Sequence, residues 1–346
     1  MPSPNSTQKL IPLDSPDEWS RALEGIPHGF CHTWGHCYAM HLTTGYQIYL
    51  YVLAIGDSRI ICPIAERPCG RFIEATTPLG FSGFTGTGDV EDFPSIWESF
   101  ARDRGYVTTY VTLNPLFDRP SFTNPTLTRE HNTLYILDLE KPEEEITSGF
   151  SQSRRRWLRR WLERGVSVIT DREILTRFFI EHYREFFLAK GFPPAYDFVE
   201  STIEMLLSLK QVYVVGAATE SGVQSVLVCC FTCYAADSFL NISLPGGIEH
   251  GAGLMWHAAK HFRSLGIPKF NLGGGLAFNE GIAESKRRFG AYPMPLKALR
   301  QVVRPDIYTE LCVEAGWDGS EGFFPPYQRY TSQKGTYVRQ DSKNLR

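Results

Sequence analysis

Three consecutive glycines, Gly273, Gly274 and Gly275, follow a short apolar segment in the last third of the chain. Glycine weakens regular structure, so three of them directly after a predicted strand contribute little to packing. They do allow a close approach of backbone or ligand, and they permit positive φ. About ten residues later, a short predicted helix ends on the basic sequence SKRRFG, residues 285–290. We therefore expect the last third of the chain to hold a site built around this turn.

The composition is that of an ordinary globular protein, with 42% hydrophobic and 21% charged residues among 346. This length favours two domains. A net charge of −3 argues against a globally basic nucleic-acid-binding protein but allows a local basic patch. No apolar run approaches the roughly 20 residues of a membrane span, and no secretory signal is visible. The eight cysteines are scattered, so we expect a reduced, cytoplasmic protein without a structural metal.

Hydrophobic periodicity predicts strands that alternate with amphipathic helices. Residues 1–15 are rich in Pro and Ser, and we expect them to form a loose leader. Each half of the remaining chain presents a helix, a hairpin, a strand, a glycine-bearing loop and a helix. This order predicts an α+β fold of two similar domains, each a mixed sheet flanked by helices.

The segment 150–165 predicts a helix with many arginines. On a helical wheel, Trp157, Leu158, Trp161 and Leu162 fall on one side. The opposite side carries Arg155, Arg156, Arg159, Arg160 and Arg164. Only Glu163 inside the helix can balance these charges. The helix is either a solvated amphipathic helix or a surface for a polyanion, such as the phosphates of tRNA or of a nucleotide-bearing substrate.

Two further features can bind an anion or supply a positive charge. Gly251 and Gly253 open a predicted helix, where free backbone N–H groups can bind a phosphate, although a plain turn explains them too. Lys286 lies near the end of the helix after the three glycines. It can neutralise a phosphate or a developing oxyanion, or it can simply complement the helix dipole. The neighbouring Arg287, Arg288 and Phe289 belong to the same predicted donor site.

These segments together resemble the FemA/FemB/FemX family of aminoacyl-tRNA-dependent peptidyltransferases and their relatives. The resemblance rests on FCHTW near the N-terminus, SQSRRRWLRRWLERGVSV, FFLAKGF followed by a tyrosine, and FNLGGG followed by ESKRRFG; it spans most of residues 30–295. It implies two GNAT-like (acyl-CoA N-acyltransferase fold) domains in tandem, one over 1–145 completed by 297–346, the other over 146–296. It also implies amide formation from an amino acid carried on tRNA, without metal, cofactor or covalent intermediate.

The resemblance also implies site residues. The family lysine, associated with the tRNA end and acyl transfer, falls on Lys286, with Ser285 in place of the usual phenylalanine. Tyr38 stands about where cell-wall members carry a lysine one turn after Trp34. Lys190 lies in AKGF, where those members read R-D-x-F. Together with Tyr196, these are the candidate acceptor-binding residues, and their departures favour a small amine or hydroxylamine of secondary metabolism over a peptidoglycan precursor.

The predicted function is therefore transfer of an aminoacyl group from aminoacyl-tRNA to a small amine, with Lys286 as the catalytic residue. The arginine helix and the 273–275 turn would hold the donor. Two alternatives stay open. One is an N-acyltransferase that takes acyl-CoA, with Gly251 and Gly253 at the pyrophosphate. The other is a non-catalytic module that binds tRNA or a nucleotide, which leaves the glycine turn and Lys286 without a purpose.

Overall fold

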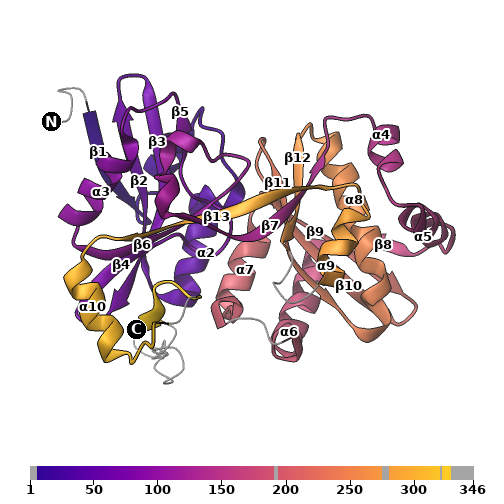
Figure 1. Cartoon of the computed structure of the whole chain (residues 1–346). Coiled ribbons are helices and arrows are strands. Elements are labelled where there is room, and N and C mark those ends of the chain that lie inside the picture. The colour runs from indigo at the N-terminus through magenta and orange to yellow at the C-terminus, as the bar shows by residue number, and fades with distance from the viewer. Residues whose placement is uncertain (1–5, 191–193, 275–279, 320–321, 329–346) are drawn as a thin grey trace.

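The computed structural model describes residues 6–190, 194–274, 280–319 and 322–328. In these ranges the strands form one mixed sheet, with helices on both faces (Figure 1). The strands are β1 (Ser6–Pro12), β2 (Gln47–Ile55), β3 (Ser58–Cys69), β4 (Phe72–Thr76), β5 (Thr85–Thr87), β6 (Tyr106–Leu113), β7 (Thr128–Asp138), β8 (Ser167–Ile169), β9 (Val212–Thr219), β10 (Gly222–Phe231), β11 (Ala236–Ser243), β12 (Lys269–Gly274) and β13 (Tyr292–Val302). The helices are α1 (Pro16–Leu23), α2 (Trp34–Thr44), α3 (Phe93–Asp103), α4 (Glu143–Ser148), α5 (Gln152–Glu163), α6 (Arg172–Lys190), α7 (Glu200–Ser208), α8 (Gly251–Ser264), α9 (Glu280–Arg287) and α10 (Pro305–Glu314).

The sheet repeats one arrangement of strands. Its order is β1-β2-β3-β4-β6-β13-β7-β12-β11-β10-β9-β8, with β5 beside β3. In the first half (β1 to β6 with β13), antiparallel neighbours lead to the parallel pair β4–β6. In the second half (β7 to β12), antiparallel neighbours lead to the parallel pair β11–β12. Helices α3 and α8 connect the two parallel pairs, as such connections require. The predicted α+β class, a mixed sheet flanked by helices, is confirmed.

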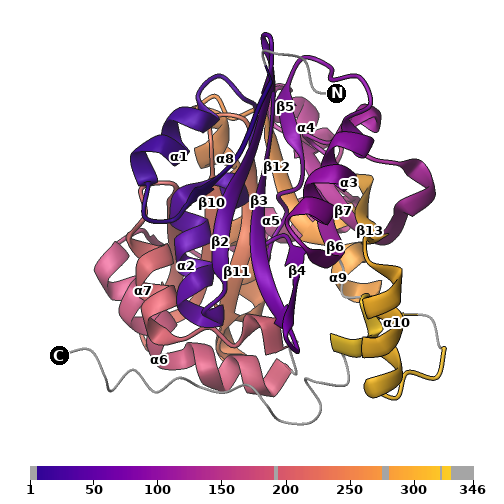
Figure 2. The ribbon, with the colours of Figure 1, turned by 90° about the vertical axis from the view of Figure 1, so that its left-hand side faces the viewer.

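Two strands join the halves into one sheet instead of the two sheets expected. Strand β13 pairs antiparallel with β6 of the first half, through Leu299↔Val111 for example, and also with β7. Strand β7 pairs on its other side with β12, where Leu137 faces Phe270. Thus β7, which follows β6 in the chain, lies beside β12, and β13, which follows β12, lies beside β6. Figures 1 and 2 show β7 and β13 running between the halves.

Both faces of the central strands are buried, and side chains alternate between them. In β2, Leu50 and Val52 face a core shared with α1, α2, α6 and α7, while Leu53 faces the core under α3. The first of these cores runs across both halves. There α2 and α7 touch, and the hydroxyl oxygens of Thr43 and Thr202 lie 2.7 Å apart. On the other face of the second half, α5 and α8 cover β9 to β12.

The expectation of a loose leader over 1–15 is wrong for Ser6–Pro12. This segment is strand β1, which pairs with β2 from Ser6↔Ile55 to Pro12↔Tyr49. It is an edge strand in which only Ile11 is fully buried, so its hydrophobic alternation is too weak to outweigh its proline and serine content. Helix α10 is also unexpected from the sequence, and it buries Ile307 and Cys312.

Candidate active site

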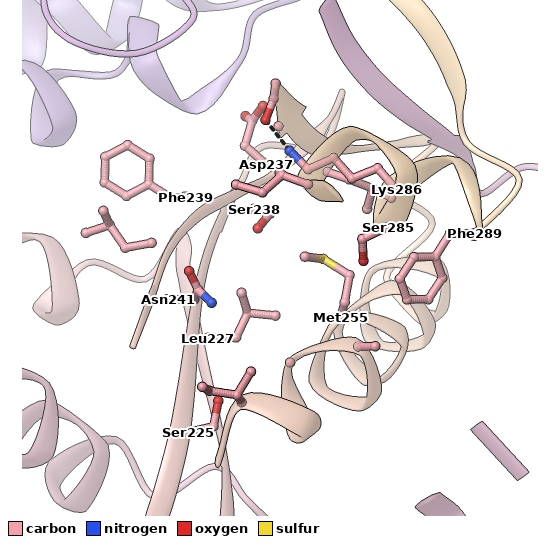
Figure 3. A pocket seen from close by; sticks show the side chains of 18 of the residues that line it. Ser225, Leu227, Asp237, Ser238, Phe239, Asn241, Met255, Ser285, Lys286 and Phe289 are labelled. Atoms are coloured by element: carbon pink, nitrogen blue, oxygen red, sulfur yellow. Dashed lines mark hydrogen bonds between the residues drawn. The ribbon is translucent and has the colours of Figure 1, made fainter. Parts of the chain in front are cut away.

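A cavity of about 790 Å³ lies where β11 and β12 stop pairing. Their parallel pairing consists of Ala236↔Phe270 and Asp237↔Asn271. The cavity is lined by the residues that come next on each strand, by the first turn of α8, and by α9, α5 and α6 (Figure 3). The first half adds Cys31 and the segment 79–81. The space between the separating ends of β11 and β12 is therefore a chamber, and residues of the first half form its remaining wall.

The first turn of α8 supplies backbone N–H groups to this chamber. Gly251 begins the helix and lines the cavity, and a Cβ there would meet no atom within 4 Å. No side chain caps this helix, which continues directly from a 3-10 helix over Pro245–His250, and the positive end of its dipole faces the chamber. Gly253 has a different role, because a Cβ on it would lie 2.4 Å from Cε2 of Trp161. Of the two predicted phosphate-loop glycines, Gly251 faces the cavity and Gly253 allows α5 to pack on α8.

Lys286 projects from α9 into the cavity. Its ammonium group donates a hydrogen bond to the carbonyl oxygen of Gly274 (Figure 3). Burial lowers the pKa of Lys286 to about 8, because no carboxylate of the described residues pairs with it. Gly273 adopts φ of +83°, and a Cβ on it would lie 3.2 Å from Nζ of Lys286. The glycine turn thus holds the lysine against main-chain oxygen. Gly275 lies outside the described residues.

Asp237 is a second buried ionisable group of the cavity, and we did not expect it from the sequence. Its side chain is on β11 and is 4% exposed. Burial raises the pKa of Asp237 to about 6, although a hydrogen bond of 2.8 Å from Nδ2 of Asn271 opposes the change. Asn271 also accepts a hydrogen bond from the backbone N–H of Gly273, at 2.8 Å. One asparagine therefore links the carboxyl group to the glycine turn that carries the lysine.

Arg154 is the arginine of α5 that lines the cavity. Its Nη2 donates to the carbonyl oxygen and the hydroxyl of Ser285, at 3.2 and 3.0 Å, and its guanidinium lies 4.5 Å from the ring centre of Phe289. Burial lowers the pKa of Arg154, and the charge of Arg288 lowers it further. The helical wheel contained a signal for this position, since residues 154, 157, 158 and 161 share one face.

The five arginines predicted to bind the donor lie on the exposed face of α5. Arg155 donates to the carbonyl oxygen of Ser148, and Arg164 pairs with Glu249 at 3.0 Å. Among the described residues no carboxylate pairs with the others, which are Arg156, Arg159 and Arg160. This unpaired face belongs to the same helix whose other face reaches the cavity through Arg154 and Trp157.

The remaining predicted donor residues are on α9 and just after it. Arg287 and Arg288 both pair with Glu284, at 3.1 Å, and both are exposed. Phe289 is buried and lines the cavity. The structure thus brings Lys286 and Phe289 to the chamber and leaves the two arginines at the surface.

The residues predicted to bind the acceptor do not lie together in the structure. Tyr196 lines the cavity. Lys190 is exposed, with Nζ 5.5 Å from the ring centre of Phe186. Trp34 stacks on Tyr38 at 4.9 Å and donates to the carbonyl oxygen of Leu13, and neither ring lines the cavity.

Two features of the described residues bear on the class of site. No three His, Cys, Asp or Glu side chains there are arranged to hold a metal ion. No helix in the same part of the chain combines the length and apolar character needed to cross a membrane.

Comparison with known proteins identifies the architecture. No family model matches the sequence, and no curated protein matches it. Among solved structures, FemX superimposes with a TM-score of 0.65 at 11% identity, over 88% of this chain and 99% of that one. L-PGS from Bacillus licheniformis gives 0.52 at 14%, over 88% and 98%. A protein of unknown function from Bacteroides thetaiotaomicron gives 0.55 at 11%, over 85% and 99%. The chain therefore has the FemAB-like tandem GNAT fold, as the sequence predicts.

Proposed function

We propose that the protein is an acyltransferase that moves the aminoacyl group of an aminoacyl-tRNA to a small amine. One observation carries the proposal: Lys286 and Asp237 line the same cavity, where burial lowers the pKa of the lysine to about 8 and raises that of the aspartate to about 6. Near neutral pH the first is a proton donor and the second a proton acceptor. Amide formation from an ammonium group and an ester requires one of each.

The reaction balances with these two groups. Asp237 accepts a proton from the acceptor ammonium, and the freed amine attacks the ester carbonyl carbon, forming the C–N bond. The Lys286 ammonium stabilises the oxyanion of the tetrahedral intermediate. When the C–O bond to the ribose breaks, Lys286 gives its proton to the leaving oxygen. The attacking nitrogen, which still carries two protons and a positive charge, gives one of them to Lys286 and restores the ammonium group. Asp237 releases the proton that it accepted to solvent.

The charge around the cavity supports tRNA as the donor. Within the described residues, Arg156, Arg159 and Arg160 have no carboxylate partner, and they lie on the helix whose other face contributes Arg154 to the cavity. Phosphates of the tRNA acceptor end on this face would place its terminal ester toward the chamber. The first turn of α8, with Gly251 facing the cavity, would take a terminal phosphate or ribose oxygen. A small acceptor of secondary metabolism completes the proposal, because Tyr38 and Lys190 depart from the cell-wall pattern.

A second candidate, an N-acyltransferase that takes acyl-CoA, is favoured by the same helix start. An uncapped helix N-terminus with an open glycine suits a pyrophosphate as well as a terminal nucleotide. The exposed arginines have no role in this alternative.

One experiment separates the candidates. The protein is incubated in parallel with a mixture of charged tRNAs and a mixture of acyl-CoAs, each with a pool of small amines, and donor loss and amide products are followed by mass spectrometry. We expect aminoacyl-tRNA to be consumed by the wild type and not by Lys286→Ala. Consumption of acyl-CoA alone would favour the second candidate. Binding of tRNA without loss of any donor would indicate a non-catalytic module and refute both.

A further inference from the structure

One part of the cavity lining is aromatic and contains residues from both halves. We call it the aromatic compartment: Cys31, Gly80, Phe81, Tyr183, Tyr196 and Phe239. The first two and Phe81 come from the first half, the tyrosines from α6 and the segment after it, and Phe239 from β11. Figure 3 shows Phe239 on the opposite side of the chamber from Phe289, with Asp237 and Ser238 between them.

Asp237 lies close enough to the aromatic compartment for its charge to change the pKa of a group there. Burial raises the pKa of the Cys31 thiol, and the charge of Asp237 raises it further. Burial also raises the pKa of Tyr196, and ionisation of Cys31 would raise it further. Gly80 closes the wall against the thiol, because a Cβ on it would lie 2.5 Å from Sγ of Cys31. The carboxyl group therefore stands at the edge of a compartment that contains aromatic rings and a neutral thiol.

The charges of the cavity determine what this compartment can accept. Among the described residues, the charged side chains that line the cavity are Arg154, Asp237, Glu249 and Lys286. Neither cation belongs to the aromatic compartment, since Arg154 donates to Ser285 and Lys286 to the Gly274 carbonyl. An acceptor phosphate or carboxylate in the aromatic compartment would lie beside the Asp237 carboxylate, which disfavours a second negative charge. An ammonium group would instead meet the carboxylate of Asp237 and the faces of aromatic rings.

We propose that the acceptor is an arylalkyl primary amine, whose ammonium group binds at Asp237 and whose ring lies in the aromatic compartment. This inference rests on the proposed aminoacyl transfer, since it names the acceptor of that reaction. The cavity size agrees with it. A volume of about 790 Å³ is within the roughly 300–1,000 Å³ of pockets for one drug-sized ligand. It can hold a terminal aminoacyl group and a small amine together.

Binding of the acceptor can be measured without any donor. The probe is 2-phenylethylamine, titrated by calorimetry into the full-length protein at pH 7.5. Its isosteres are 2-phenylethanol, which is neutral, 3-phenylpropionate, which is anionic, and butylamine, which lacks the ring; O-phosphoethanolamine tests a phosphate. We expect 2-phenylethylamine to bind tightest of the five. Equal or tighter binding of the anion or of O-phosphoethanolamine would overturn the inference.

Two substitutions locate the two ends of the probe. Asp237→Asn should weaken 2-phenylethylamine about 10- to 100-fold and leave 2-phenylethanol unchanged, because only the first carries the charge that the carboxylate binds. Tyr196→Leu should weaken 2-phenylethylamine about 3- to 10-fold relative to butylamine. This ratio does not depend on the fraction of folded protein. Tyr292→Leu, on β13 and outside the cavity lining, is the matched control. An unchanged ratio in Tyr196→Leu would place the ring elsewhere and overturn the inference.

The outcome separates this inference from the proposed function. If 2-phenylethylamine binds as expected but no donor is consumed in its presence, the aminoacyl transfer is wrong and the amine site stands. If aminoacyl-tRNA is consumed with another acceptor and 2-phenylethylamine does not bind, the transfer stands and the acceptor class is wrong.

Discussion

Replacing Lys286 by methionine should stabilise the protein while strongly reducing transfer. The lysine carries its charge in a buried site without a carboxylate partner among the described residues, and burial lowers its pKa to about 8 from 10.5. Below pH 8 the folded protein therefore holds an ammonium group in an environment that disfavours it. Methionine has a similar length and no charge. The site is thus arranged for chemistry at the expense of stability.

The magnitude follows from the two pKa values. The difference between 10.5 and about 8 is a factor of about 300 in proton affinity, or about 3 kcal/mol at about 1.4 kcal/mol per factor of ten. Methionine also removes the hydrogen bond from the ammonium group to the Gly274 carbonyl, and a hydrogen bond of a charged group contributes about 2 kcal/mol. We therefore expect Lys286→Met to raise the free energy of unfolding by about 1 kcal/mol at pH 7.

The advantage of the variant should disappear as the pH rises. Above about pH 8 the folded wild type loses the lysine proton, while the unfolded chain keeps it up to about 10.5. The unfolded state then binds more protons, so the stability of the wild type rises with pH and that of the variant does not. Between pH 8 and 9.5 the difference should fall by about 2 kcal/mol.

Urea denaturation of both proteins at half-unit steps from pH 6.5 to 9.5 measures this difference. Aminoacyl transfer is measured on the same preparations and should fall about 10²- to 10³-fold in Lys286→Met. Lys260→Met, at an exposed position of α8, is the control for loss of one positive charge. A stability difference that stays constant over this pH range, or a variant less stable than the wild type at pH 7, would refute the reasoning.

Three further predictions test other parts of the site. The rate of transfer should follow a bell-shaped pH profile, because Asp237 must be deprotonated, above about pH 6, and Lys286 protonated, below about pH 8. Asp237→Asn should remove the acidic limb of this profile and lower kcat about 10²-fold. An unchanged acidic limb would exclude Asp237 as the proton acceptor. Combined replacement of Arg156, Arg159 and Arg160 by alanine should raise the KM for aminoacyl-tRNA and reduce the slope of log KM against log salt by about 2 to 3, whereas replacement of the exposed Arg21, Arg71 and Arg102 of the first half should not. Gly253→Ala should destabilise the protein by about 1–3 kcal/mol, because its Cβ meets Trp161, while Gly251→Ala should not; equal stability of the two in denaturant titrations would contradict the packing described.

The elements that the sequence predicts well are those with a strong local signal. Strand β6 carries such a signal, because its side chains are buried on both faces and it is rich in β-branched residues. The glycine turn and Lys286 were found because glycines after a strand and a basic helix end are local features. Strand β1 was missed because an edge strand with one fully buried residue has little hydrophobic alternation.

The parts of the site that the sequence could not predict depend on tertiary contacts. Asp237 is one aspartate in a β-rich segment, and its altered pKa comes from burial in a chamber that β12, α9 and the first half complete. Cys31 and the segment 79–81 lie more than 150 positions before Asp237, and no spacing rule connects them to it. Arg154 was on the helical wheel, but the wheel alone does not say which face meets a cavity.

The two halves use a carboxylate on corresponding strands in opposite ways. Glu74 on β4 lies beside the parallel pair β4–β6 and is 1% exposed. Its oxygens accept hydrogen bonds from four side chains, those of Arg67, Thr108, Tyr327 and Gln328. Asp237 on β11 lies beside the parallel pair β11–β12 and receives one side-chain hydrogen bond among the described residues, from Asn271.

This difference accounts for the asymmetry of the molecule. A carboxylate whose hydrogen-bonding capacity is met by four protein donors stabilises the fold and has little left for a ligand. In the first half the last two donors come from the segment after α10. A carboxylate with one donor retains lone pairs for an ammonium group that enters from the cavity. The same sheet arrangement thus yields a structural buried acid in one half and a chemically available one in the other.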